Sequence, residues 1–376
     1  MRRRQFLRAA AASGALVASR PGFGNQPQTS TGASANPAQP HPPMRMHVGT
    51  QRRPTDRETL EFCKRHGVDR ICGYPLDPAL NDTRQYWTLD ELERTRDLCE
   101  QHGISLDMVT VPLLWSRSVD IARFSAIMLA DDPERDRDIE HIQEMIRHCA
   151  RAGVPAFKYN MNLLGVLRTE PTPGRGGSRY STWRLAEAGE RELTRAGIVN
   201  ADEFWERIQY FLDRIIPVCD EFGIRAACHP HDPGVPPEGF QGVARVLGTV
   251  DGLKQFVSLH DSEHHGLNFC VGSVSEMLED PAGEVYDVVR YFGERDKLFN
   301  IHMRNIRGRR DDFQEVYIDE GDVDVYRVLM TLRETGYPYM VMPDHVPGHP
   351  DDPGRRQGFA HAFGYLQGVM KAVGRA

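Results

Sequence analysis

The chain lacks the features that would mark a membrane protein, a disulfide-stabilised domain or a dinucleotide-binding fold. No apolar run approaches the roughly 20 residues of a membrane-spanning helix. The seven cysteines are odd in number and include no C-x-x-C pair, so they suit neither a disulfide framework nor a structural zinc knuckle. No glycine-rich phosphate loop follows the first predicted strand. The length of 376 residues, with 40% hydrophobic and 26% charged residues, suits one large globular domain with insertions.

A surplus of positive charge is also absent. The formal net charge is −7, and removal of residues 1–24, which hold five arginines and no acidic residue, would change it to −12. An acidic protein is a poor candidate for binding nucleic acid or an anionic membrane surface. We therefore expect a small-molecule partner, with neither nucleic-acid binding nor membrane insertion of the mature chain.

The N-terminus has the pattern of an export signal. The paired arginines Arg3 and Arg4 precede Phe-Leu and a short acid-free apolar run. We interpret residues 1–24 as a twin-arginine signal that directs the folded protein to the periplasm, and residues 25–43 as a disordered tether rich in Pro, Ser and Gln. Residues 44–376 remain for the catalytic domain.

Short strand-like runs alternate with amphipathic helical stretches from residue 44 onward. Eight strand-helix units in order predict a (β/α)₈ TIM barrel, an α/β fold with a parallel sheet, rather than an open doubly wound sheet. The predicted strands are 44–50, 68–75, 104–112, 155–161, 224–230, 267–272, 298–305 and 339–345.

One long insertion follows the fourth predicted strand. From about 162 to 200 the chain carries no clear strand-helix rhythm. Because it follows the carboxyl end of a strand, it lies on the catalytic face of a barrel, where it would act as a lid or form an ordinary surface loop.

Four side chains of metal-binding type stand at the ends of four successive predicted strands. They are separated by 41, 32 and 42 residues, and each interval fits one strand-helix unit. Strand ends converge at the C-terminal face of a barrel, so these side chains can meet at one ion. Two imidazoles, a thiolate and a carboxylate would accept zinc, cobalt or iron, so ligand type alone does not choose the ion. The predicted metal ligands are His229, Cys270, His302 and Asp344.

Several segments together resemble the mannonate dehydratase family of the xylose-isomerase-like barrel superfamily. The resemblance covers nearly all of the chain after the tether and is densest from about residue 205. The segments are Tyr159-Asn160 with the later VLRT (166–169), FLDRIIPVCDEFGIRAACHPHDP (211–233), FCVGS (269–273), IHMR (301–304), FQE with the later GDVDVY (313–326) and MPDH (342–345).

The resemblance implies a manganese-dependent hydro-lyase. Its reaction would be the loss of water from D-mannonate to give 2-keto-3-deoxy-D-gluconate, and relatives of this kind tend to form homo-oligomers. The family's metal ligands fall on the four residues already selected from their places at strand ends.

Three residues are predicted to take part in catalysis. His345 follows the ligand Asp344 directly, and we interpret it as the acid/base. Arg304 stands two residues after His302, where its planar guanidinium would pair with a substrate carboxylate or form a salt bridge at the barrel rim. Tyr159 belongs to the family's Tyr-Asn segment.

Five further residues are predicted to bind substrate or support the site. Asn160 and Arg168 match the family's Tyr-Asn and Arg-Thr segments, and Lys158 brings an additional cation. His231 and Asp232 would lie behind the ligands and orient His229.

Departures from the family pattern keep two other functions open. Gln314 and Ile318 stand where the family has histidines, and Phe359 or Ala360 stands where a tyrosine is expected. Neither Phe nor Ala can transfer a proton. One alternative is a metal-dependent isomerase, epimerase or C–O lyase acting on another sugar in the periplasm. The other is a non-catalytic sugar-binding barrel that keeps the ion for structure.

Overall fold

The computed structural model describes residues 41–75, 80, 83–236 and 238–376. The predicted export signal at 1–24 and all but the last three residues of the predicted tether at 25–43 lie outside the described residues. Within the described part of the chain, no helix has the length and apolar character needed to cross a membrane.

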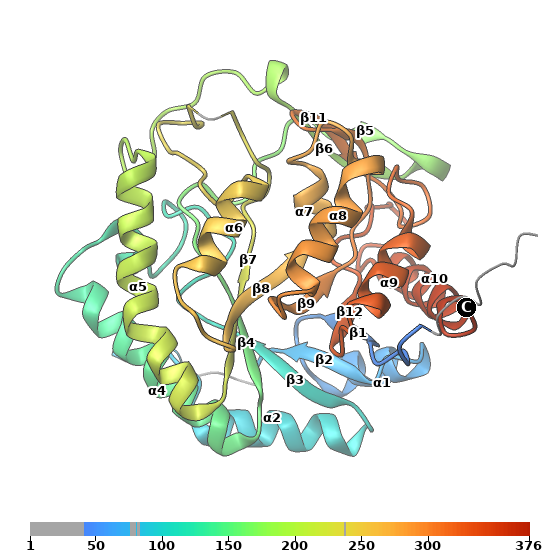
Figure 1. The fold of residues 1–376 in the computed structure, drawn as a ribbon, viewed down its shortest axis with the longest axis horizontal. Helices are drawn as coiled ribbons and strands as arrows, with labels where there is room; N and C mark the ends of the chain where they lie inside the picture. The colour runs from blue at the N-terminus through green and yellow to red at the C-terminus, as the bar shows by residue number, and fades with distance from the viewer. Residues whose placement is uncertain (1–40, 76–79, 81–82, 237) are drawn as a thin grey trace, which may run out of the picture. The chain divides into compact units, whose positions relative to one another are not determined.

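The predicted barrel is confirmed. Eight parallel strands close on themselves in the order β1-β12-β9-β8-β7-β4-β3-β2, so strands adjacent in sequence are adjacent in space and β1 also pairs with β12 (Figure 1). Each barrel strand falls within or next to one of the eight predicted runs. The barrel strands are β1 (His47–Gln51), β2 (Arg70–Gly73), β3 (Ser105–Thr110), β4 (Ala156–Asn160), β7 (Arg225–His229), β8 (His265–Cys270), β9 (Leu298–His302) and β12 (Met340–Met342).

Helices cover the outside of the barrel and begin and end at sequence signals. Thr88 and Asn200 each form a capping box with a glutamate three residues later, which satisfies the first backbone N–H groups of α2 and α5. Gly153 and Gly223 end α4 and α5 with positive φ angles of 73° and 67°. The helices are α1 (Arg57–Arg65), α2 (Leu89–Gln101), α3 (Ala126–Leu129), α4 (Glu134–Ala152), α5 (Ala201–Phe222), α6 (Val250–Ser258), α7 (Val271–Ser275), α8 (Pro281–Gly293), α9 (Val325–Glu334) and α10 (Arg356–Val373).

Strand β4 shows how alternation sorts side chains between the barrel interior and the helical layer. Ala156 belongs to a small apolar cluster that includes residues from other barrel strands, whereas Phe157 and Tyr159 belong to the larger core. Because successive side chains of a strand point to opposite faces, Lys158 and Asn160 face the interior with Ala156. This sorting decides which residues of the Tyr-Asn segment can reach the site.

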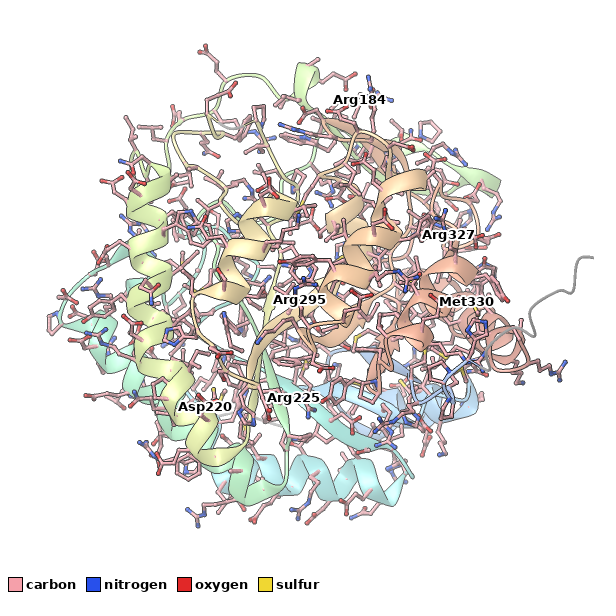
Figure 2. All side chains as sticks on the ribbon, viewed as in Figure 1. Arg184, Asp220, Arg225, Arg295, Arg327 and Met330 are labelled. Carbon is pink, nitrogen blue, oxygen red and sulfur yellow. The ribbon has the colours of Figure 1, made fainter. Side chains whose placement is uncertain are left out.

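The insertion after β4 forms part of a second sheet. Strands β5 (Thr172–Pro173) and β6 (Arg179–Arg184) pair with each other, and β6 pairs with β11 (Asp312–Glu315), which pairs with β10 (Ile306–Arg309). Both segments leave the carboxyl ends of barrel strands, so this sheet lies beyond the catalytic end. In Figure 2, Arg184 of this sheet lies at the top, while Asp220 and Arg225, at the end of α5 and the start of β7, lie at the bottom.

Candidate active site

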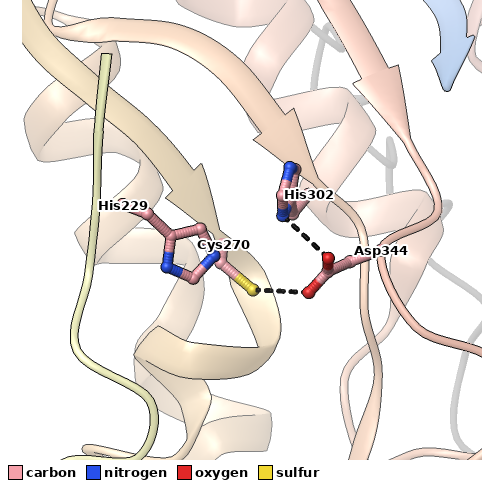
Figure 3. A group of neighbouring side chains, drawn as sticks. All are labelled: His229, Cys270, His302 and Asp344. Carbon is pink, nitrogen blue, oxygen red and sulfur yellow. Dashed lines mark hydrogen bonds and ion pairs between the residues drawn. The ribbon is translucent and has the colours of Figure 1, made fainter. Parts of the chain in front are cut away.

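The structure brings the four predicted metal ligands together. His229, Cys270 and His302 are the last residues of β7, β8 and β9, and Asp344 follows β12 by two residues. One potential ligand atom from each lies within 4.8 Å of those of the others. Figure 3 shows the four side chains converging, with Asp344 between Cys270 and His302.

A hydrogen bond fixes which ring nitrogen of His229 is free to coordinate a metal ion. Nδ1 of His229 lies 2.7 Å from the carbonyl oxygen of Pro230. A carbonyl only accepts, so Nδ1 carries the proton and Nε2 keeps a free lone pair. Nδ1 of His302 lies 3.1 Å from Oδ1 of Asp344, and neither Nδ1 nor Nε2 of this buried ring meets the criteria for a hydrogen bond among the described residues. Sγ of Cys270 lies 3.7 Å from Oδ2 of Asp344.

The electrostatics of this cluster suit a bound cation. Burial lowers the pKa of His302 to about 4 and holds the pKa of His229 well below its usual range, so both rings are neutral and able to coordinate. Burial raises the pKa of the Cys270 thiol to about 12, so its thiolate requires a positive partner. Burial opposes ionisation of Asp344, yet the neighbouring histidines His345 and His302 hold its pKa well below the usual range.

The donor set therefore fits a divalent metal ion. A carboxylate, a thiol that ionises on metal binding and two neutral imidazoles converge, and the ring of His302 has buried nitrogen atoms without a hydrogen-bond partner among the described residues, one of which coordination would satisfy. Nitrogen, sulfur and oxygen donors together are compatible with several first-row transition metals.

A buried ion-pair cluster lies beside the ligand set. The guanidinium of Arg304, 1% exposed, donates to Asp232 at 2.7 Å, Glu276 at 2.7 Å and Glu315 at 3.0 Å. Arg168 pairs with Asp232 at 2.6 Å and with Glu315. Burial raises the pKa of Glu276 well above its usual range, whereas the two arginines outweigh burial and hold the pKa of Asp232 well below its own.

Glu315 of this ion-pair cluster orients the ring of His345. Nδ1 of His345 lies 2.9 Å from Oε2 of Glu315 and 3.1 Å from Nη1 of Arg304. Both hydrogens of that Nη1 are already donated, to Asp232 and to the other oxygen of Glu315. Nδ1 of His345 therefore donates to Glu315, because a carboxylate can only accept. Nε2 is left as the atom that exchanges protons, and it lies 3.8 Å from Oδ2 of Asp344.

A cavity of about 560 Å³ opens next to His345. His345 is 38% exposed at the side chain and lines the cavity together with Glu315 and Arg168. The insertion contributes Arg179 and Ser181 of β6, so its strands form a wall of the cavity. A ligand in this space reaches the imidazole that stands beside the metal-ligand cluster.

Tyr159 and His231 do not reach the site, which corrects two predictions. Tyr159 is fully buried and packs against Phe211 of α5, with ring centroids 5.4 Å apart, because it points outward from β4. His231 packs on Phe204 of the same helix, and its Nε2 donates to the carbonyl of Met161 at 2.8 Å. Neither side chain can contact a ligand in the barrel interior.

For Arg304 the structure shows the salt-bridge alternative rather than a free group for a substrate carboxylate, and it does not place Asp232 against His229. Arg304 is enclosed by carboxylates, so it has no free face for a substrate carboxylate; its role is to hold Glu315 and the neighbouring acids in place. Asp232 contacts Arg168 and Arg304 rather than His229, whose orientation comes from the carbonyl of Pro230.

Three predicted substrate-binding residues remain in or next to the site. Arg168 lines the cavity. Lys158 and Asn160 face the barrel interior from β4, and Nζ of Lys158 donates to Oε1 of Gln51 at 3.1 Å. The positive charge of Lys158 contributes, after burial, to the lowered pKa of His229.

Residues that replace expected proton-transfer groups have structural partners. Gln314 donates to Oγ1 of Thr172 at 2.7 Å and so links β11 to β5. Ile318 is buried in the core. Phe359 packs against Phe363 and lies under the guanidinium of Arg52, 4.4 Å from the ring centroid.

Sequence reasoning did not select Glu315 and Glu276 as site residues. Glu315 lies within the FQE segment, so a signal for it was present. Glu276 follows the short helix α7, six residues after Cys270, and nothing in the local sequence marks it as buried. Both belong to the site only because the folded chain brings them next to Arg168 and Arg304.

A closed parallel barrel with a buried cluster of potential metal ligands at its strand ends, and an oriented imidazole beside it, makes this chain a (β/α)₈ barrel with a candidate metal site. The family model described as D-mannonate dehydratase (UxuA) matches residues 49–196 and 184–376. The chain belongs to this family, which is a family of hydro-lyases, and the predicted family is thereby confirmed.

Individual relatives agree with the family assignment. Mannonate dehydratase 2 of Halalkalibacterium halodurans is 26% identical over 357 residues, which are 85% of this chain and 97% of that protein. Mannonate dehydratase of Lactococcus lactis subsp. cremoris is 27% identical over 358 residues, 84% and 94% of the two chains. The chain therefore spans nearly the full length of these relatives.

Solved structures show the same fold. The crystal structure of mannonate dehydratase from Streptococcus suis serotype 2 matches with a TM-score of 0.73 at 24% identity and covers 88% of this chain and 95% of that one. A xylose isomerase domain protein from Planctomyces limnophilus matches with a TM-score of 0.55 at 16% identity, covering 89% and 99%. The xylose-isomerase-like barrel predicted from sequence is confirmed.

Proposed function

We propose that this protein eliminates water from D-mannonate to give 2-keto-3-deoxy-D-gluconate, with manganese as its metal ion. One observation carries the proposal: an imidazole whose Nδ1 proton is fixed by a buried carboxylate faces a cavity beside four converging metal ligands. Family membership supplies the reaction class, and the residues of this chain supply the groups that the reaction requires.

The residues that would hold the ion are His229, Cys270, His302 and Asp344. A bound divalent cation supplies positive charge opposite the negative charge that develops on substrate oxygens when C2 loses its proton.

His345 carries out the proton transfers in this proposal. Its Nε2 takes the proton from C2 and returns it to the departing C3 hydroxyl, so the C3–O bond breaks, water leaves and the imidazole ends unchanged. The resulting enol tautomerises to the 2-keto acid. Glu315 keeps the other ring nitrogen protonated throughout, and Arg304 holds Glu315 in place.

Interior cations and amides of β4 would bind the substrate. Lys158 and Asn160 point into the barrel, and Arg168 borders the cavity with its guanidinium already paired to Asp232 and Glu315. These groups offer donors to the hydroxyl and carboxylate oxygens of a sugar acid.

A turnover assay tests the proposed reaction. The manganese-loaded protein is mixed with D-mannonate, and the 2-keto-3-deoxy acid is followed by absorbance after reaction with semicarbazide. We expect product formation that stops with chelator and returns with manganese. No product from protein with stoichiometric manganese would contradict the proposal, and would favour an isomerase or epimerase acting on another sugar, in line with Gln314, Ile318 and Phe359 at positions where proton-transfer groups are expected.

The twin-arginine pattern supports a further proposal, export to the periplasm. We expect the wild-type chain in the periplasmic fraction of a bacterial host that has the twin-arginine pathway. Replacement of Arg3 and Arg4 by lysine should leave it in the cytoplasm; unchanged localisation of that variant would contradict export by this route. The homo-oligomer implied by the resemblance can be measured on the same material by light scattering.

A further inference from the structure

The cavity beside His345 is more basic than the proposed reaction requires. Besides His345, four of its lining residues carry basic side chains, and Glu315 is its one acidic lining residue among those described. That carboxylate is already shared by Arg168, Arg304 and His345. The four basic lining residues besides His345 are Arg168, Arg179, His349 and Arg355.

Two of these basic residues already have partners. Arg168 is paired with Asp232 and Glu315. His349 contacts the carboxylate of Asp351 through Nδ1 and lies 3.0 Å from the carbonyl of Gly176 through Nε2.

The other two, Arg179 and Arg355, meet at one place on the cavity wall. Arg179 begins β6 and exchanges backbone hydrogen bonds with Gly348 in both directions, at 2.8 and 3.3 Å. Arg355 precedes α10, and a side chain on Gly348 would lie 4.0 Å from its Nη2. The two arginines therefore flank Gly348, three residues beyond His345.

Neither guanidinium has a carboxylate within ion-pair distance in the part of the chain that the structure describes. This distinguishes them from Arg175 on the same insertion, which pairs with Asp319 at 2.7 Å. Two unpaired cations on one wall attract an anion, and the planar guanidinium fork matches a carboxylate or a phosphate.

The size of the cavity also favours a ligand with an additional group beyond D-mannonate. A volume of about 560 Å³ falls in the range of sites that enclose drug-sized ligands, and it exceeds what a six-carbon sugar acid fills. In D-mannonate the end remote from the reacting carbons is a neutral hydroxymethyl group, which makes no use of either arginine.

We propose that Arg179 and Arg355 form an anion-binding subsite that holds a second negative group, a carboxylate or a phosphate, at the end of a sugar acid substrate remote from its C1 carboxylate. The inference rests on the proposed function and extends the substrate class of the same site to doubly anionic sugar acids. His345 and the metal-ligand cluster act at C2 and C3, while the two arginines bind the negative group at the opposite end of the substrate.

Calorimetry on the manganese-loaded full chain tests the subsite without requiring turnover. Three probes are compared: D-mannonate, D-mannarate, which carries a carboxylate at C6, and 6-phospho-D-mannonate. The variants are Arg179→Gln, Arg355→Gln and both together. Arg309→Gln is the matched control, because Arg309 is 65% exposed on the same four-stranded sheet and does not line the cavity.

We expect the wild type and Arg309→Gln to bind at least one doubly anionic probe about tenfold or more tightly than D-mannonate. The double variant should lose most of that difference in affinity. The doubly anionic probe that binds more tightly identifies the second group as carboxylate or phosphate. Equal affinity for all three probes, or a preference that survives in the double variant, would overturn the subsite.

The outcomes separate this inference from the proposed reaction. A preference that depends on the two arginines, without turnover of any probe, supports the subsite and contradicts the dehydratase activity. Turnover of D-mannonate with no preference for the doubly anionic probes contradicts the subsite and leaves the reaction intact.

Discussion

Nδ1 of His345 donates to Oε2 of Glu315 over 2.9 Å, and Glu315 itself is held by Arg304 and Arg168. The donor follows barrel strand β12 by three residues, whereas the acceptor lies on β11 of the second sheet. The imidazole beside the metal ligands is thus oriented by a carboxylate from outside the barrel. The second sheet therefore supplies part of the active site in addition to covering it.

Glu315→Gln should lower kcat for the proposed reaction by on the order of 100-fold or more, because an amide no longer fixes the proton on Nδ1 of His345. KM and bound manganese should change little. Glu279→Gln, an exposed glutamate near the same sheet, is the control. An unchanged kcat in a folded Glu315→Gln variant would show that Glu315 does not position His345.

Cys270→Ser should abolish the thiolate-to-metal charge-transfer absorption of the cobalt-substituted protein and weaken metal binding at least tenfold, on the order expected for loss of one ligand. Cys228→Ser is a matched control, since Cys228 lies on β7 beside His229 but belongs to the outer core. The same spectrum in wild type and Cys270→Ser would contradict ligation by Cys270.

Tyr159→Phe should keep kcat within about twofold of wild type, because the ring packs against Phe211 away from the barrel interior and the lost hydroxyl makes no contact with the site. A steady-state assay measures this directly. A loss of 100-fold at unchanged stability would restore Tyr159 to the catalytic residues.

Much of the site could be predicted because it follows from barrel geometry. A residue that ends a parallel barrel strand lies at the C-terminal face, where the strand ends converge, and His229, Cys270 and His302 lie there. The family motifs selected the same residues together with Asp344, which the strand-end argument had also selected, and His345 was chosen as the neighbour of Asp344.

Other parts of the site depend on contacts that local sequence does not specify. The Tyr-Asn segment carries no indication of which residue faces inward, and only alternation from Ala156 places Lys158 and Asn160 inside and Tyr159 outside. The environment of Arg304 comes from Asp232, Glu276 and Glu315, which lie on separate segments and meet only in the folded chain. The second sheet pairs segments more than 120 residues apart in the sequence. The sequence of the insertion, taken alone, therefore predicts a loop.

Arg304→Lys should reduce the free energy of unfolding by about 3–5 kcal/mol, because the single nitrogen of a lysine cannot reach three buried carboxylates at once and leaves buried carboxylate oxygens without a donor. Urea unfolding measures the change. Arg309→Lys, an exposed ion pair, should change it by less than about 1 kcal/mol. Equal effects of the two substitutions would contradict the account of the buried cluster.

His265 should make the protein acid-sensitive. It is fully buried at the start of β8, where its Nε2 donates to the carbonyl of Phe256 at 2.8 Å, and burial lowers its pKa to about 4 from 6.5. The unfolded chain therefore binds the proton first, so this contribution to stability is complete above pH 6.5 and is lost as the pH falls toward 4. The loss amounts to roughly 3 kcal/mol.

The measurement is the urea midpoint between pH 7 and pH 4 for wild type and His265→Gln. The variant should be less stable at pH 7 and show a shallower decline, while His264→Gln, at the partly exposed neighbouring position, controls for removal of an imidazole. Parallel declines in wild type and His265→Gln would contradict the assignment.

The central claim is that one metal ion, held by four strand-end ligands, supports dehydration of D-mannonate. The most direct measurement is the rate of 2-keto-3-deoxy acid formation by metal-free protein as manganese is added in fractions of an equivalent. We predict a linear rise that ends at one equivalent per chain in wild type, and no rise over that range in Asp344→Asn. Product formation that is independent of manganese, or no product at any equivalence despite measured binding, would contradict the claim.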